Sequence, residues 1–323
     1  PDPCRRANRK GAGQSRTVKK ERMQKNPWMC GPLAPLKDVE GKRVPSGLAP
    51  VVDAHVHVFP DPIFKAVRGW FDEYGWPIRY KLPSEDLIRF LLSRGVSHVV
   101  ALQYAHKPGI ARDLNRYMAG LCGRFPGRVT GMATLFPGEP EAGAVLREAF
   151  AMGLSGVKLH THVQCVDMQS EPMDQVCDIC VQAGKPLVVH AGQEPKSPAY
   201  KCDPYLLCSA DKTERLLRQF PGLKMCVPHL GMGEFTAYRR LIETYDTLWL
   251  DTTMAIADFF PSDEDVRLAE MRTDRIMYGT DFPNIPYAWD RELKKLMEHP
   301  LAPDALSNIL WGNAVAFFNL KLA

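Results

Sequence analysis

Residues 51–60 read VVDAHVHVFP, a short valine-rich run that also holds Asp53, His55 and His57. The pattern predicts a β-strand. Because alternate side chains of a strand point to the same side, we expect these three polar residues to share one face. Two histidines two positions apart on a strand can place both imidazoles on one cation, whereas a helical metal pair would be four positions apart. Such a pair often arises by chance, so a metal site here depends on what the rest of the chain adds.

Strand and helix alternate along the chain after this first strand. Apolar runs that predict seven further strands lie at residues 98–102, 128–135, 156–161, 186–191, 223–229, 247–252 and 275–281. Helical patterns lie at residues 84–95, 109–124, 139–152, 171–183, 212–220, 234–245, 262–271, 289–298, 303–310 and 312–320. Eight strands, each followed by a helix, predict an α/β fold of the (β/α)8 TIM-barrel type. A doubly wound sheet would need a glycine-rich first turn between strand and helix, which this sequence lacks.

The chain divides into a tail, residues 1–50, and one barrel domain, residues 51–323. Residues 1–27 hold nine Lys or Arg and two Asp or Glu, a net charge of +7, whereas the whole chain carries +4. The basic character therefore belongs to the tail, which is predicted to be disordered. The tail has no apolar run typical of a secretory signal, and it has no aromatic residue before Trp28 that would favour a nucleic-acid-binding arm. Because the chain begins with Pro1, we consider Met23 or Met29 as the natural start.

Membrane and cysteine signals favour a reducing, aqueous compartment. No segment has 18 consecutive apolar residues, so we expect no membrane span. Nine cysteines in 323 residues are an odd number without the spacing of a disulfide framework, which favours the cytoplasm. Cys177 and Cys180 form a C-x-x-C within a helical pattern. Without a second such pair we interpret them as helix-core thiols. Cys202 and Cys208 lie in a loop and receive no assigned chemistry.

Histidines gather at the ends of the predicted strands, where the active sites of TIM barrels form. Asp281 ends the eighth strand, and six of the nine histidines lie at strand ends, namely His55, His57, His160, His162, His190 and His229. So many imidazoles converging on a barrel mouth need a cation or carboxylates to satisfy them. The set therefore predicts a metal centre. Lys158 lies in phase with His160 and His162 on the fourth strand.

The residues that carry this chemistry occur in an ordered series of short motifs: HVH at 55–57, KLH at 158–160, VVH at 188–190, HLG at 229–231, GTDFP at 279–283 and NILWGNA at 308–314. This series resembles the amidohydrolase superfamily. More narrowly, it resembles the amidohydrolase-related branch that includes aminocarboxymuconate-semialdehyde and γ-resorcylate decarboxylases. The resemblance covers roughly residues 51–320 and leaves out the tail. The motifs are specific for the superfamily and not for a substrate.

The resemblance implies a metal centre in which His55, His57, His190 and Asp281 are the ligands and one position stays open for water. Imidazole and carboxylate ligands suit zinc first, with iron or manganese as alternatives. A bound cation would lower the pKa of that water from ~15.7 towards ~7. Asp281 would then accept the water proton and pass it to the leaving group, while His229 would polarise the substrate carbonyl or stabilise the developing oxyanion.

Lys158 has two interpretations. In some members of the superfamily a lysine at this strand end is carbamylated and bridges two metals, so two zinc ions are an alternative to one. In the interpretation that we favour, one metal is present and unmodified Lys158 is a buried cation hydrogen-bonded to Asp53 or Asp281. His160 and His162 would then face the substrate or support the ligands.

Substrate specificity should lie in long loops at the same face of the barrel, at residues 60–83, 193–211 and 282–289. Aromatic side chains of these loops would either wall an apolar pocket or pack the loops onto the barrel: Trp70, Trp76, Tyr200 and Tyr205. Arg239 and Arg240 could hold a substrate carboxylate across a subunit contact, but we favour a solvated helix face for both. The resemblance alone suggests a homodimer.

Three functions fit these observations. The favoured one is a metal-dependent hydrolase that acts on an amide, lactone or ester of a small cyclic or carboxylated compound. The second is a lyase that decarboxylates a carboxylated aromatic or muconate-type compound without oxidation. The same ligands serve both reactions, so ligand spacing does not separate them. A barrel that binds a metal without turnover is disfavoured, because Asp281 and His229 complete a catalytic set.

Overall fold

The computed structural model describes residues 38–260 and 264–321. Most of the tail predicted for residues 1–50 lies outside these ranges. Residues 38–50 contain bends and turns without a helix or strand. Within this segment, Glu40 pairs with Arg79 and Arg94 of the barrel domain, at 3.3 and 2.8 Å. The last part of the predicted tail is therefore held against the barrel by ion pairs.

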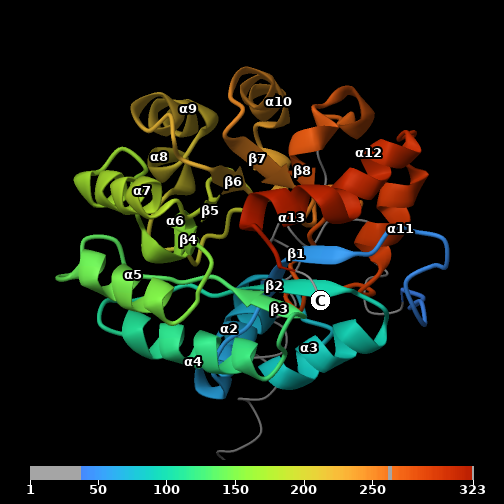
Figure 1. The fold of residues 1–323 in the computed structure, drawn as a ribbon, viewed down its shortest axis with the longest axis horizontal. Helices are drawn as coiled ribbons and strands as arrows, with labels where there is room; N and C mark the ends of the chain where they lie inside the picture. Colours follow the sequence, from blue (N-terminus) through green and yellow to red (C-terminus); the bar gives the residue numbers. More distant parts are fainter. Residues whose placement is uncertain (1–37, 261–263, 322–323) are drawn as a thin grey trace, which may run out of the picture.

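Within the described residues, eight short parallel strands form the centre of the molecule (Figure 1). They are β1 (Val52–His57), β2 (His98–Leu102), β3 (Val129–Gly131), β4 (Val157–His160), β5 (Leu187–His190), β6 (Met225–Val227), β7 (Leu248–Asp251) and β8 (Ile276–Met277). Hydrogen bonds join β1 to β3 into one sheet and β4 to β8 into another, always between neighbours in sequence. Single parallel bridges, Ala133 to Val157 and Val56 to Phe282, join the two sheets at both edges. The strands therefore close into a barrel, and the TIM-barrel prediction is confirmed.

Helices surround the strands in Figure 1. They are α2 (Asp61–Tyr74), α3 (Ser84–Ser93), α4 (Ala111–Gly123), α5 (Ala142–Ala151), α6 (Thr161–Gln164), α7 (Glu171–Ala183), α8 (Pro204–Leu207), α9 (Ala210–Gln219), α10 (Phe235–Thr244), α11 (Arg291–Glu298), α12 (Pro303–Ser307) and α13 (Asn313–Phe318). None of those helices combines the length and the apolar character that a membrane span requires.

Two helical segments differ from the sequence prediction. The helix α2 forms within residues 60–83, which we expected to be a loop. Pro62 in its first turn suits a helix start, and Asp61 favours the positive end of the helix dipole. In the described part of the helix predicted at residues 262–271, only a single 3₁₀ turn forms, Leu268–Glu270, because Arg267 before it takes a left-handed backbone with φ of 46°.

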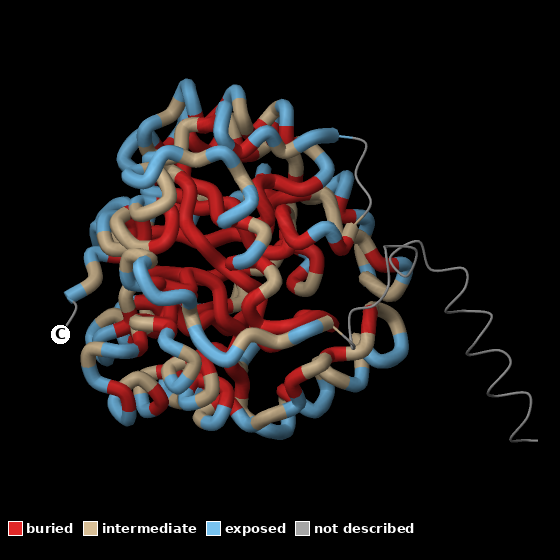
Figure 2. Tube along the Cα trace, turned by 90° about the vertical axis from the view of Figure 1, so that its right-hand side faces the viewer, coloured by how far each residue is buried: buried red, intermediate tan, exposed pale blue. Residues whose placement is uncertain are grey.

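Buried residues line the interior of the molecule, whereas the outer helices are exposed on one side only (Figure 2). An inner apolar cluster contains Val52 and Ala54 of β1, Met277 of β8 and Phe317 of α13. A larger cluster fills the layer between the strands and the helices. Burial of this apolar surface, worth roughly 25 cal/mol per Å², is what fixes the strand ends relative to one another.

The strand β1 does not keep the simple alternation that we expected. Its pairing register with β2 shifts between Asp53 and Val56, which is a β-bulge or a similar irregularity. Consistent with this shift, Ala54 belongs to the inner apolar cluster and Val56 to the outer one. His57 lines the central cavity, whereas the carboxylate of Asp53 accepts hydrogen bonds from Thr280. The expectation that Asp53 shares one face with His55 and His57 is therefore not met.

Candidate metal centre

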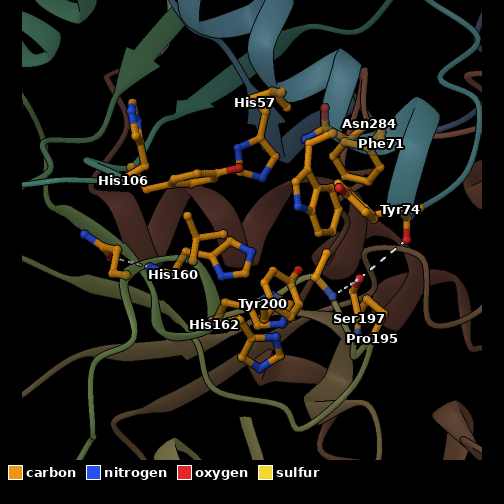
Figure 3. Close-up of a pocket in the computed structure, with 18 of the residues that line it drawn as sticks. His57, Phe71, Tyr74, His106, His160, His162, Pro195, Ser197, Tyr200 and Asn284 are labelled. Carbon is orange, nitrogen blue, oxygen red and sulfur yellow. Dashed lines mark hydrogen bonds between the residues drawn. The ribbon is translucent and has the colours of Figure 1, made fainter. Parts of the chain in front are cut away.

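A cavity of about 610 Å³ opens at the carboxyl ends of the strands. Its wall includes Asp281 and histidines from four strand ends, His57, His160, His190 and His229. Figure 3 shows His57, His160 and His162 gathered around the same space, with the ring of Tyr200 beside that of His162. The structure thus brings together the side chains that the sequence placed at separate strand ends.

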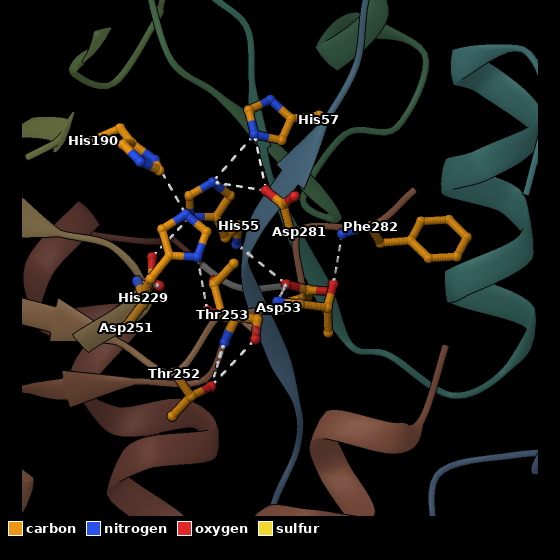
Figure 4. Close-up of polar contacts among 12 residues, drawn as sticks. Asp53, His55, His57, His190, His229, Asp251, Thr252, Thr253, Asp281 and Phe282 are labelled. Carbon is orange, nitrogen blue, oxygen red and sulfur yellow. Dashed lines mark hydrogen bonds and ion pairs between the residues drawn. The ribbon is translucent and has the colours of Figure 1, made fainter. Parts of the chain in front are cut away.

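Three of the predicted ligands form a compact buried cluster below this cavity (Figure 4). The Nε2 atoms of His55 and His57 lie 3.2 Å apart, and each lies close to Asp281 Oδ1, at 3.5 and 3.2 Å respectively. Among the described residues, these three form the one group of His, Cys, Asp or Glu side chains whose potential ligand atoms all lie within 4.8 Å of one another. Two imidazoles and a carboxylate in this arrangement are suitable ligands for a divalent metal.

Asp251, at the end of β7, orients His55. The Nδ1 atom of His55 lies 2.8 Å from Asp251 Oδ2. Burial lowers the pKa of His55 to about 3, so the ring is neutral. Burial alone would raise the pKa of Asp251, but its contacts with His55 outweigh burial and lower that pKa to about 2. The neutral ring therefore donates its Nδ1 hydrogen to Asp251 and turns the Nε2 lone pair towards the cluster, as a metal ligand requires.

A chain of hydrogen bonds orients His190 in the same way. Thr253 O accepts from His229 Nδ1 at 2.9 Å, and His229 Nε2 lies 3.1 Å from His190 Nδ1. With the Nδ1 hydrogen of His229 committed to Thr253, its Nε2 is an acceptor, so His190 donates from Nδ1. The buried His190 Nε2 then carries a lone pair and has no hydrogen-bond partner among the described residues. A buried polar atom without a partner calls for a ligand, but His190 does not belong to the group whose ligand atoms lie within 4.8 Å of one another, so its predicted role as a ligand stays a prediction.

Lys158 does not make the hydrogen bond that we expected. Its side chain is fully buried, and its Nζ has no hydrogen-bond partner within the described part of the chain. Burial lowers the pKa of Lys158 to about 8, although the charges of Asp251 and Asp281 act in the opposite direction. The expected hydrogen bond from Lys158 to Asp53 or Asp281 is therefore absent among the described residues. What remains is an electrostatic attraction to Asp281.

His160 and His162 both lie on the cavity wall. The ring of His160 stacks on that of His190, with centroids 4.3 Å apart and planes 9° apart. Gly192 O lies 3.0 Å from His162 Nε2, and the Nδ1 atoms of both histidines have no hydrogen-bond partner among the described residues. Their position agrees with the substrate-facing role that the sequence suggested.

Sequence reasoning missed the residues that fix the ligands in place. Besides Asp251, the carboxylate of Asp53 accepts hydrogen bonds from His55 N at 3.2 Å and from Thr280 N and Oγ1 at 3.2 and 2.6 Å. These bonds join β1 to the segment after β8, where Asp281 has a left-handed backbone with φ of 67°. A signal for Asp251 was present in the sequence, because it is a carboxylate at the carboxyl end of a predicted strand.

Gly279 allows this close packing. A Cβ atom at position 279 would lie 2.4 Å from Thr253 Oγ1 and 2.9 Å from the Cβ of His55. The glycine of the Gly-Thr-Asp motif is therefore required by the approach of the backbone to His55.

Aromatic side chains wall the outer part of the cavity. Trp70 of α2 stacks on Tyr200 with centroids 5.3 Å apart, and both line the cavity together with Trp76. Tyr205 is absent from the cavity wall and is 44% exposed. Among the described lining residues Asp281 is the one acidic side chain, whereas the lysines are three: Lys107, Lys196 and Lys201.

Arg239 and Arg240 lie away from the cavity. Arg239 donates to Asp265 O and Val266 O, and Arg240 pairs with Glu214. Arg240 is exposed, as we expected, whereas Arg239 is half-buried with its Nε atom buried, so the expected solvated face is not met for Arg239.

A family model described as amidohydrolase matches residues 52–320 of the chain. No curated protein matches the chain by sequence. Among solved structures, 5-carboxyvanillate decarboxylase from Novosphingobium aromaticivorans, complexed with manganese and 4-hydroxy-3-methoxy-5-nitrobenzoic acid, is 17% identical. It has a TM-score of 0.64, and the match covers 87% of this chain and 99% of that one.

Two further solved structures have the same fold. Dihydroxybenzoic acid decarboxylase from a Polaromonas species, with bound manganese and 2-nitroresorcinol, is 15% identical with a TM-score of 0.61, over 85% of this chain and 98% of that one. A Pseudomonas putida protein, provisionally assigned as a 2-pyrone-4,6-dicarboxylic acid hydrolase, is 20% identical with a TM-score of 0.60, over 85% and 99%. At these identities the likeness establishes the barrel fold alone.

Proposed function

This chain belongs to the amidohydrolase family, and we propose that it is a metal-dependent decarboxylase of a carboxylated aromatic compound. The observation that carries the proposal is the buried cluster of His55, His57 and Asp281 next to a large cavity with aromatic walls. From the sequence we favoured hydrolysis and kept decarboxylation as the alternative. Several structurally similar proteins are decarboxylases of hydroxylated aromatic acids, which supports the alternative better.

His55, His57, His190 and Asp281 would hold one divalent metal. The buried donor atoms of the cluster and the unpartnered Nε2 of His190 fit such an ion. We expected zinc first from the ligand types, but manganese becomes the first candidate because two similar structures contain it. When bound, the cation would supply Lewis-acid polarisation of substrate oxygens.

Asp281 and His229 are the groups that would handle protons. Burial raises the pKa of Asp281, but its contacts with His57 outweigh burial and lower the pKa below its usual range. Asp281 is therefore ionised in the free protein and must first take a proton before it can deliver one to the ring carbon that loses carbon dioxide. His229 donates from Nδ1 to Thr253 O and accepts the Nδ1 hydrogen of His190 at Nε2, so it would have to take a proton at Nε2 before it could polarise a substrate carbonyl.

The cavity favours an anionic, largely apolar substrate. Trp70, Trp76 and Tyr200 offer faces for an aromatic ring, and the lysines in the wall outnumber the single carboxylate of Asp281. A volume of about 610 Å³ falls within the range typical of sites that enclose a small organic molecule.

The experiment is a substrate panel assayed for carbon dioxide. Protein loaded with manganese or with zinc is incubated in ¹⁸O-labelled water with 5-carboxyvanillate, dihydroxybenzoates and 2-pyrone-4,6-dicarboxylate. We expect release of carbon dioxide from an aromatic acid, with a product that has gained one hydrogen on the ring and no ¹⁸O. Ring opening with incorporation of ¹⁸O, without carbon dioxide, would contradict the proposal and support hydrolysis.

Hydrolysis is the second candidate function. It is favoured by the similarity to the provisionally assigned pyrone hydrolase, whose identity to this chain is 20%. The same panel decides between the two, because a lactone substrate takes up water and an aromatic acid does not.

A further inference from the structure

Three cysteines surround His162 at the mouth of the cavity. Cys165 follows α6, is exposed and lines the cavity, whereas Cys202 is half-buried in the loop that carries Tyr200. Cys208 is buried after α8. The metal function proposed above uses none of these thiols.

Two of the three thiols converge on one atom. Cys165 Sγ and Cys202 Sγ both donate to His162 O, at 3.8 and 3.3 Å, so the two sulfur atoms share one acceptor. Cys208 Sγ lies on the other side of His162, 3.5 Å from its Nε2, and donates to Pro204 O at 3.4 Å. The pair that faces each other is therefore Cys165 and Cys202.

The backbone of Cys165 is unusual. It ends α6 in the left-handed region, with φ of 52° and ψ of 46°. Glycine or asparagine normally occupies such a position, and other residues there are strained. A strained cysteine whose thiol meets a second thiol indicates that the side chain has a use.

We propose that Cys165 and Cys202 are a reversible oxidation site, at which a hydroperoxide converts the two thiols into a disulfide. The sulfur of Cys165 attacks the peroxide, the O–O bond breaks, and a sulfenic acid and one water form when hydrogen peroxide is the oxidant. The thiol of Cys202 then attacks the sulfenic sulfur, the S–S bond forms, and a second water leaves. The two thiols lose two protons and two electrons in total, and a reducing thiol restores them.

The structure assigns the two cysteines different parts. Cys165 is the exposed thiol and meets the oxidant first. Cys202 is half-buried and is reached by the oxidant less readily, so it is the thiol that resolves the sulfenic acid formed at Cys165.

Oxidation at this site would tie the cavity wall together. Cys165 ends the segment that carries His160 and His162, whereas Cys202 lies two residues after Tyr200. Tyr200 stacks on Trp70 and contacts His162 edge-on, with ring centroids 5.3 Å apart in both pairs. A disulfide would therefore hold the loop that carries Tyr200 against the cavity and restrict its movement.

The test is peptide mapping of the full-length protein after treatment with hydrogen peroxide and alkylation of free thiols. Tandem mass spectrometry should find a peptide pair linked through Cys165 and Cys202, which dithiothreitol removes. The variants Cys165→Ser and Cys202→Ser should each lose the link, while Cys208→Ser, the matched control, should keep it. A link that joins Cys202 to Cys208, or irreversible oxidation of Cys165 without any link, would overturn the proposal.

A second measurement follows the loop itself. Trypsin should cleave after Lys196 and Lys201 more slowly in the oxidised protein than in the reduced one, and Cys202→Ser should abolish the difference. Equal cleavage rates in the two forms would overturn the claim that the bond fixes this loop.

Discussion

The two sides of the candidate metal centre differ in how far their buried polar atoms are hydrogen-bonded. On the side of β1, β7 and β8, the carboxylates of Asp53 and Asp251 accept hydrogen bonds from protein donors, while among the described residues His57 Nδ1 has no hydrogen-bond partner there. On the side of β4 and β5, four buried atoms have no hydrogen-bond partner among the described residues, namely Lys158 Nζ, His160 Nδ1, His162 Nδ1 and His190 Nε2. Because an unpaired buried polar group costs free energy, the first side is a preformed scaffold and the second is arranged to receive ligands.

The largest expected effect is at Asp281, which follows β8 on the scaffold side and contacts His55 and His57. Asp281→Asn should lower kcat for decarboxylation by about 10²–10⁴-fold, because the group that carries the proton is lost. Steady-state kinetics and metal content are measured together, with Asp265→Asn as the exposed control. An unchanged kcat would exclude the role given to Asp281.

Breaking the scaffold side at Asp251 should weaken metal binding. Asp251→Asn removes the charged acceptor of His55 Nδ1, and loss of such a supporting contact typically lowers metal affinity by about 10–100-fold. Competition with a chelator gives the dissociation constant, and Asp113→Asn, on an exposed helix, is the control. Equal affinity in wild type and Asp251→Asn would show that Asp251 does not orient His55.

A smaller change on the scaffold side should cost stability. Thr280→Val removes the hydroxyl that donates to Asp53 and accepts from Phe282 N, so buried polar groups lose partners. The free energy of unfolding of the metal-free protein should fall by about 1–3 kcal/mol in urea denaturation. Thr244→Val, whose hydroxyl is exposed, serves as the control and should change little. No loss in Thr280→Val would remove the basis for calling this side a scaffold.

A matching change on the ligand-receiving side should have the opposite sign. Lys158→Met replaces an unpartnered buried cation by an apolar side chain of similar length, so the metal-free protein should gain about 1–3 kcal/mol. Since the pKa of Lys158 is about 8 in the folded protein and about 10.5 in the unfolded chain, the wild type should become more stable between these pH values. The advantage of Lys158→Met should therefore shrink as the pH rises from 8 to 10.5, as urea denaturation at several pH values would show.

The control for this prediction is Lys201→Met, which removes an exposed lysine and should bring no gain. Lower stability of Lys158→Met than of wild type at pH 7 would mean that Lys158 has a partner and that the two sides do not differ in this way.

The sequence predicted the barrel because strand and helix alternate with clear apolar runs from β1 to α13. It also predicted which side chains meet, because in a parallel barrel all strands end at the same face. Those two inferences need only the local pattern and the topology. The convergence of the strand-end histidines and Asp281 follows from them, whereas the selection of His55, His57 and Asp281 as ligands came from the family resemblance.

The remaining features depend on tertiary contacts that local patterns do not encode. The register shift in β1 arises from pairing with β2, so Asp53 leaves the face of the two histidines. The hydrogen bond between His55 and Asp251 joins residues 196 positions apart, and no local spacing predicts it. We expected a loop where α2 forms, because the segment is rich in aromatic residues and proline. Its Asp-Pro start is nevertheless a recognisable helix signal.

The most direct test of the metal centre is the metal content per chain, measured by elemental analysis on wild type and on Lys158→Met purified without chelators. We predict about one manganese or zinc ion per chain in both proteins, because the ligands that we propose are His55, His57, His190 and Asp281, without Lys158. Two ions in wild type that fall towards one or none in Lys158→Met would contradict this and indicate a lysine-bridged pair. No metal in either protein would contradict a metal-dependent reaction altogether.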